Sequence, residues 1–224
     1  MLTIISTLSA LLPILFFVFF CIRNSTRELW VIFIYSIASF LFDGFLTSSS
    51  WAIDHKFLLW NVFAILEFCI LSYFFYIIIK NRPIRILIQI LAVLYLIAFS
   101  LFATSSNNHF NSILSAISSV IILTFCIVFF VLSMKITAEP TTLFSPTFLI
   151  VIALLLYVAS TLFLYIIAGH LAEKEREKYW SINNVSNIIS NLIFSIAFFL
   201  NRYQKKNPFP ENAAVDFTSF PDDR

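Results

Sequence analysis

Two carboxylates lie inside long apolar segments of the chain, where ionisable side chains are rare. Glu67 falls near the middle of the segment 57–79, about 15 Å from its start if the segment is an α-helix. In a hydrocarbon layer about 30 Å thick, this depth is close to the midplane. A carboxylate there is costly, usually faces the bundle interior and marks a functional site. Asp43 is about 8 Å from the end of its own segment, so it either joins this site or forms a helix terminus beside Gly44.

Amide and hydroxyl side chains in other apolar segments could complete a pocket with these acids. Asn184, Asn187 and Asn191 are spaced i, i+3, i+7, so they share one helical face, and in lipid each amide needs a partner from another helix. The predicted ligand-binding residues are Glu67, Asp43, Asn61, Tyr157, Thr161, Asn184, Asn187 and Asn191.

These residues also have purely structural interpretations. Polar side chains in membrane helices often join helices, at about 0.6 kcal/mol each. Glu67 itself could be protonated and hydrogen-bonded to an asparagine with no further role. If it is ionised, a site with two acids and no buried Lys or Arg suits a cation, an amine, a hydrogen-bonding ligand or a proton, and disfavours an anion. The charge of the ligand therefore stays open.

The elements that position these residues must be membrane-spanning helices. The chain of 224 residues is 60% hydrophobic and 12% charged, whereas soluble domains carry about 25% charged residues. With two glycines and no alternating pattern, it does not fit an outer-membrane barrel. We predict an all-α, polytopic membrane protein with seven transmembrane helices in residues 1–200, and a disordered cytoplasmic tail in 201–224. The predicted spans are 2–22, 29–49, 57–79, 86–103, 112–134, 146–168 and 180–200.

The distribution of Lys and Arg predicts the orientation. If the N-terminus is outside, ten of the 14 basic residues fall in inner segments and four in outer ones. We therefore expect the N-terminus outside and the C-terminus inside. Several spans are then polar in their outer half and apolar in their inner half. This pattern predicts a polar cavity open to the outside, with Glu67 and Asn191 at its floor and an apolar plug beneath.

The three histidines of the chain could take part in metal-dependent chemistry. His55, His109 and His170 fall in links that this orientation places outside, near Asp43 and Asp54, and such a set could bind zinc and activate water. No HxxxH or HExxH spacing occurs, however. We predict no catalytic residue, metal ligand or cofactor, and an outer-leaflet metal-dependent hydrolase remains an alternative.

The favoured function is a ligand-sensing or partner-coupled signalling module in the bacterial inner membrane. We expect no output domain within the chain, so a separate cytoplasmic signalling protein would be its protein partner. The other expected partners are the lipid bilayer and a small cationic or hydrogen-bonding ligand. No nucleic acid is expected. A small-solute or proton-coupled transporter is the alternative, although Gly44 and Pro13 alone supply the glycine or proline that broken transporter helices need.

Two stretches carry a resemblance to known proteins. Asn61 with Glu67 in the third span, and the sequence SINNVSN at 181–187, resemble uncharacterised small seven-helix bacterial membrane proteins, as does the overall length. Such proteins look similar to the membrane part of some bacterial sensors. The resemblance implies no established activity.

Overall fold

The computed structural model describes residues 2–23, 25–48, 56–103, 112–136, 145–168 and 173–206, and these residues are almost entirely helical. The elements are α1 (Leu2–Ser9), α2 (Leu11–Phe16), the π-helix η1 (Phe17–Cys21), α3 (Arg27–Ser48), α5 (Lys56–Ile78), α6 (Arg82–Ala103), α7 (Ser112–Ile136), α8 (Pro146–Ala168) and α9 (Glu173–Lys206).

Seven helices within the described residues are long and apolar enough to cross a membrane, with α1, α2 and η1 together forming the first. The prediction of an all-α chain with seven such helices is therefore confirmed. Their length and hydropathy indicate a multi-pass membrane protein. The predicted orientation across the membrane stays a prediction.

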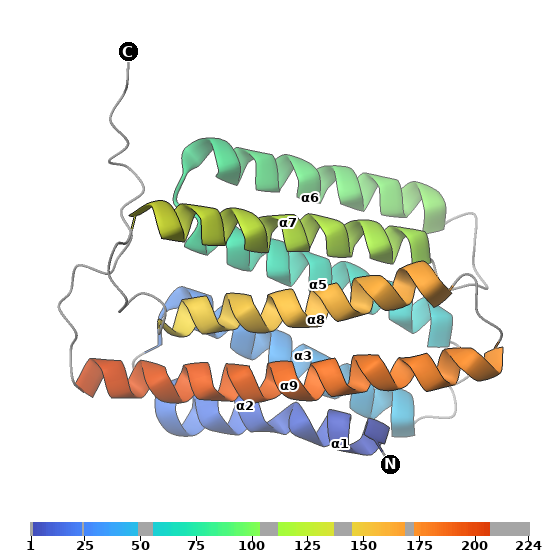
Figure 1. The fold of residues 1–224 in the computed structure, drawn as a ribbon, viewed down its shortest axis with the longest axis horizontal. Helices are drawn as coiled ribbons and strands as arrows, with labels where there is room; N and C mark the ends of the chain where they lie inside the picture. The colour runs from blue at the N-terminus through green and yellow to red at the C-terminus, as the bar shows by residue number, and fades with distance from the viewer. Residues whose placement is uncertain are drawn as a thin grey trace.

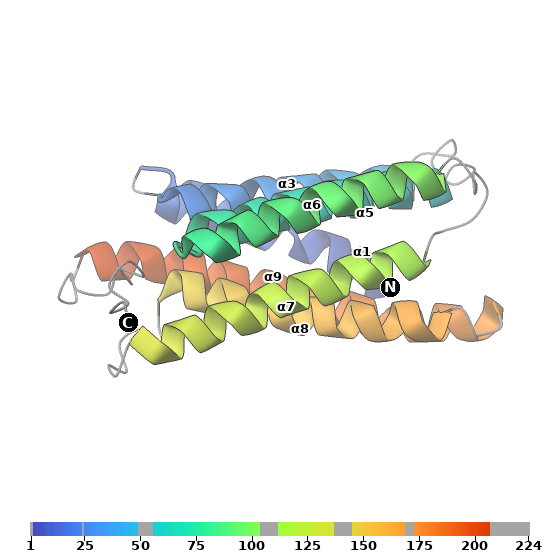
Figure 2. The same cartoon turned by 90° about the horizontal axis from the view of Figure 1, so that it is seen from above.

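The helices lie side by side along the longest axis of the molecule (Figure 1). Seen from above, α3, α5 and α6 form one layer, and α7, α8 and α9 form the other (Figure 2). The first and last spans run in the same direction and pack together along their length, so α9 lies between α8 and the first span (Figure 1). This arrangement brings the first and last spans into one wall of the bundle.

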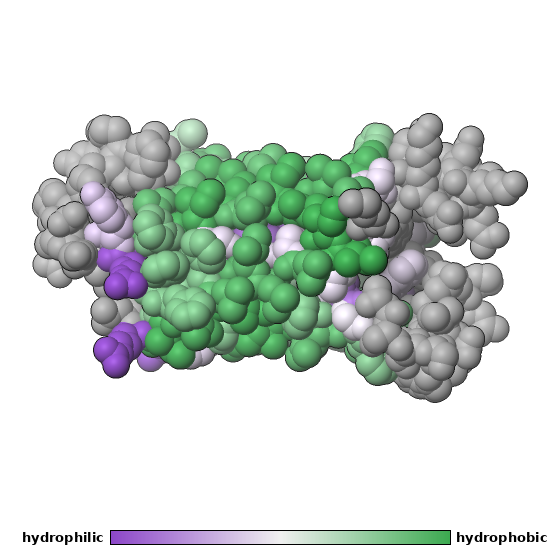
Figure 3. Space-filling view, turned by 90° about the horizontal axis from the view of Figure 1, so that it is seen from below, coloured by the Kyte–Doolittle hydropathy of each residue, from purple (hydrophilic) through white to green (hydrophobic). Residues whose placement is uncertain are grey.

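The two ends of the bundle differ in charge. We call the end where α1 begins the N-terminal end. The opposite end, here the basic end, exposes the side chains of Arg23, Arg27, Lys80, Arg82 and Arg202. Figure 3 shows hydrophilic groups there and a broad apolar band over the middle of the molecule. Such a band is what a lipid environment requires of a helical bundle.

An aromatic and aliphatic core fills the half of the bundle nearer the basic end. Phe17, Phe75 and Phe198 are fully buried. The Phe17 ring stacks on Phe33 at 4.1 Å and meets Phe198 edge-on at 5.2 Å. The predicted apolar plug is thus present, although it is not wholly apolar, because Asn201 is also buried there.

The first span is broken, in contrast to the continuous helix 2–22 expected from sequence. α1 ends at Ser9, α2 begins at Leu11, and the chain turns into a π-helix over Phe17–Cys21. Pro13 accounts for the break, because it has no N–H for the Ser9 carbonyl and its ring clashes with that carbonyl. By contrast, Gly44 does not interrupt α3.

The last helix is longer than the predicted span 180–200. α9 begins at Glu173 and continues to Lys206. The charged run 173–178 consists of Glu, Lys and Arg, which are good helix formers, so it extends the helix instead of forming a link. Residues 207–224 lie outside the described residues, and the disordered tail stays a prediction.

Candidate functional site

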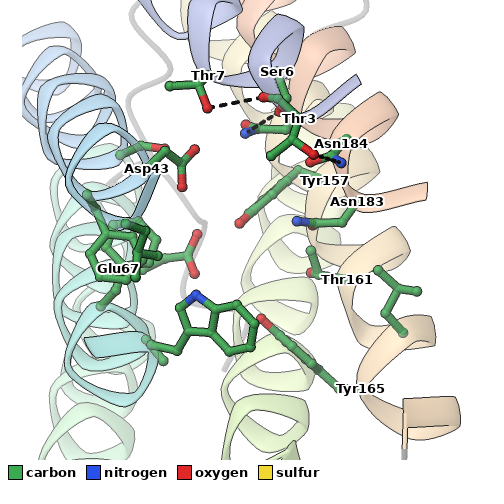
Figure 4. Close-up of a pocket in the computed structure, with 18 residues that line it drawn as sticks. Thr3, Ser6, Thr7, Asp43, Glu67, Tyr157, Thr161, Tyr165, Asn183 and Asn184 are labelled. Carbon is green, nitrogen blue, oxygen red and sulfur yellow. Dashed lines mark hydrogen bonds between the residues drawn. The ribbon is translucent and has the colours of Figure 1, made fainter. Parts of the chain in front are cut away.

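A polar cavity of about 210 Å³ lies among α1, α3, α5, α8 and α9 in the half nearer the N-terminal end. In Figure 4, Asp43 and Glu67 stand on one wall, and Tyr157, Thr161, Asn183 and Asn184 stand on the opposite wall. The lining residues are Thr3, Ser6, Thr7, Ser39, Phe42, Asp43, Leu46, Trp60, Phe63, Ala64, Glu67, Tyr157, Thr161, Leu164, Tyr165, Asn183, Asn184 and Asn187.

The carboxylate of Glu67 is held by one tyrosine and faces a second. The hydroxyl of buried Tyr35 on α3 donates a hydrogen bond to its Oε1 at 2.8 Å. The hydroxyl of Tyr157 on α8 points toward the same carboxylate from the opposite wall in Figure 4. Glu67 therefore joins α3 and α5, and it faces the cavity and not the lipid-facing surface.

Helical spacing explains how α3 and α8 present several polar groups to this site. Tyr35, Ser39 and Asp43 are spaced i, i+4, i+8, and so are Tyr157, Thr161 and Tyr165 on α8. Residues four apart lie above one another on one face of a helix. Each helix therefore contributes one continuous stripe to the site.

A ladder of amide hydrogen bonds closes the wall between the first and last spans. The side-chain amide of Asn184 donates to Thr3 Oγ1 at 3.5 Å, and that of Asn187 donates to Ser6 Oγ at 3.2 Å. One turn deeper, Asn191 donates to Ser9 Oγ at 2.9 Å. These bonds satisfy the amides within the bundle, as lipid burial requires.

The structure brings most of the predicted site residues to one cavity. Glu67, Asp43, Tyr157, Thr161, Asn184 and Asn187 all line it. Their role in binding stays a prediction.

Asn61 and Asn191 are the predicted residues that lie away from this cavity, for different reasons. Asn61 is six positions before Glu67, which at about 100° per residue places the two side chains about 120° apart around α5. Asn191 shares the face of Asn184, but it lies deeper and is buried against Ser9. The predicted cavity floor at Asn191 is therefore covered by the first span.

Sequence reasoning did not select Tyr35, nor any aromatic residue of the lining besides Tyr157. Trp60 and Phe63 line the cavity, and Phe63 stacks on Phe42 at 4.3 Å. Within an apolar segment these residues look like ordinary core. Their spacing could have identified them, because residues seven or eight apart share a helical face. Trp60 is seven residues before Glu67, and Tyr35 is eight residues before Asp43.

The structure does not address the predicted alternative of a metal-dependent hydrolase at the histidines. His55, His109 and His170 lie outside the described residues. Among the residues that are described, no group of three or more His, Cys, Asp or Glu side chains lies together.

The described residues thus form a bundle with seven helices long and apolar enough to cross a membrane, and a polar cavity lies among them. Comparison of the chain with protein-family models, with curated proteins and with solved structures gives no match. The resemblance to small seven-helix bacterial membrane proteins stays a prediction.

Proposed function

We propose that this chain is a membrane-embedded receptor that binds a small ligand in the Glu67 cavity and signals to a separate protein at its basic end. The proposal rests on one observation, the division of the bundle into a half with a polar cavity and a half with a packed core. A polar cavity occupies one half, and a tightly packed core closes the other half beneath it. A ligand could enter such a cavity and change the helix packing without passing through.

The basic end supports the proposed orientation. Its exposed Arg and Lys side chains would lie in the cytoplasm under the positive-inside rule, with the cavity opening to the outside. In a bacterial inner membrane, that end would meet a cytoplasmic signalling protein. The ligand would then act from outside and the partner from inside.

A thermal-stability screen of the purified full-length chain tests the proposal. We expect at least one member of a panel of small amines, alcohols, sugars and amino acids to raise the melting temperature of the native chain. Glu67→Gln should abolish the shift. Glu28→Gln, which makes the same substitution at the basic end, should retain it. A panel without any shift, or shifts that Glu67→Gln leaves unchanged, would overturn the proposal.

A small-solute transporter is the second candidate, favoured by the break in the first span. Discontinuous helices beside a central site are typical of transporters, and α1 and α2 separate at Ala10, beside the Ser9–Asn191 hydrogen bond. Flux of the screened ligand into proteoliposomes separates the two functions. A receptor binds without flux, whereas a transporter moves the ligand and loses that flux in Glu67→Gln.

A further inference from the structure

We infer that the cavity takes a small organic ammonium ion, a primary amine on a short apolar chain. This inference rests on the proposed function, because it names the chemical class of the ligand for the same cavity. The inference follows from three properties of the lining: which hydrogen-bonding atoms remain available, which charges are present, and which rings surround them.

Several donor hydrogens of the lining are already used inside the protein. Thr7 and Thr161 donate their hydroxyl hydrogens to the carbonyls of Thr3 and Val158, at 3.1 and 3.0 Å. The amides of Asn184 and Asn187 donate to hydroxyls of α1. These hydroxyl oxygens keep lone pairs that can accept. The lining therefore offers several hydroxyl oxygens as acceptors for a ligand.

Asn183 supplies an acceptor that the protein leaves unsatisfied. Its Oδ1 is buried and finds no hydrogen-bond partner among the described residues, although Asn183 lines the cavity. Figure 4 shows its side chain extending toward the cavity with the amide nitrogen foremost, and turning the amide over brings the oxygen to the cavity instead. A buried acceptor without a partner costs about 1–3 kcal/mol. A ligand with N–H donors would remove that cost.

The charges of the lining favour a cation. Asp43 and Glu67 line the cavity, and no Lys, Arg or His is among the described lining residues. The Glu67 carboxylate accepts a hydrogen bond from the Tyr35 hydroxyl, which opposes the penalty that burial places on its anionic form. An ammonium group offers three donors and the opposite charge, so it matches both carboxylates and the Asn183 oxygen.

The rings distinguish an organic ammonium from a metal ion. Phe42, Trp60, Phe63, Tyr157 and Tyr165 all line the cavity. Aromatic rings attract organic cations through their faces and pack against alkyl groups. Hard metal ions instead require six or more oxygen ligands and gain nothing from phenylalanine. At about 210 Å³ the cavity is below the usual range of about 300–1,000 Å³ for drug-sized ligands, so the chain must be short.

Titration calorimetry of the full-length protein in lipid nanodiscs tests this inference. The probes are n-butylammonium, n-butanol, butyrate, sodium and calcium at constant ionic strength. We expect n-butylammonium to bind at least about tenfold more tightly than n-butanol, a difference of about 1.4 kcal/mol. Glu67→Gln should remove that preference while n-butanol binding changes by less than about twofold. The control Glu28→Gln should behave like the native protein.

Each other result overturns the inference. Equal binding of n-butanol would indicate a neutral hydrogen-bonding ligand, and tighter binding of sodium, calcium or butyrate would indicate another charge class. A dissociation constant of about 1 mM corresponds to a binding free energy of about −4 kcal/mol. If n-butylammonium at about 10 mM gives no heat of binding, the inference is also overturned. None of these results refutes the receptor proposal, which fails only if the wider thermal screen finds no ligand that depends on Glu67. If Glu67→Gln does not fold, Asn183→Ala gives the second test and should weaken n-butylammonium selectively.

Discussion

The hydroxyl of Tyr35 on α3 donates a hydrogen bond of 2.8 Å to the carboxylate of Glu67 on α5. This contact joins two helices of one layer and fixes the acid at the edge of the cavity. Tyr35 is only 5% exposed, so its hydroxyl depends on partners inside the bundle. The bond therefore matters for stability and for the direction of the carboxylate.

Tyr35→Phe should lower the free energy of unfolding by about 1 kcal/mol, because it removes the donor and keeps the ring. Tyr73→Phe is the matched control, since Tyr73 is 55% exposed on α5. Chemical denaturation in detergent micelles measures both. An equal effect of the two substitutions would contradict the assigned role of Tyr35.

The amide ladder between α1 and α9 should be visible as energetic coupling. A double-mutant cycle of Ser9→Ala and Asn191→Ala removes the 2.9 Å bond. We expect a coupling energy of about 0.6 to 1.7 kcal/mol from the melting or denaturation curves of the four proteins. Ligand binding should change little, because Asn191 does not line the cavity. Additive effects would show that the two side chains do not interact.

Pro13→Ala should raise the melting temperature, because it restores an N–H for the Ser9 carbonyl in the middle of the first span. Pro83→Ala is the control. Pro83 is the second residue of α6, where the missing N–H has no intrahelical partner in any case. A melting temperature unchanged or lowered by Pro13→Ala would mean that another feature causes the break.

The sequence was sufficient to predict the spans and part of the site. Long apolar runs decide where helices cross a membrane, so their positions needed no tertiary information. Glu67 and Asn184 could be recognised because polar groups are rare in such runs. Tyr35 could not, because a tyrosine in an apolar helix has the same pattern whether it packs or binds a carboxylate. The pairing of Ser9 with Asn191 depends on contacts between distant segments, which one sequence does not specify.

The orientation can be tested with reporters at the C-terminus. Because the exposed basic side chains gather at one end, we expect a C-terminal fluorescent protein to be active and a C-terminal alkaline phosphatase to be inactive in a bacterial host. A fusion after Ser48 lies at the opposite end and should give the reverse pattern. Phosphatase activity at the C-terminus would invert the proposed direction of the cavity.

Cysteine labelling at two positions of α8 tests the division of the bundle most directly. In a background with Cys21, Cys69 and Cys126 replaced by alanine, Thr161→Cys places a thiol at the cavity, and Leu154→Cys places one in the buried core seven residues nearer the basic end. The two positions share a helical face. A membrane-impermeant trimethylammonium methanethiosulfonate reagent added on the side of the N-terminus should modify Thr161→Cys and leave Leu154→Cys unmodified. Labelling of both positions, or of neither, would contradict an open polar cavity above a sealed core.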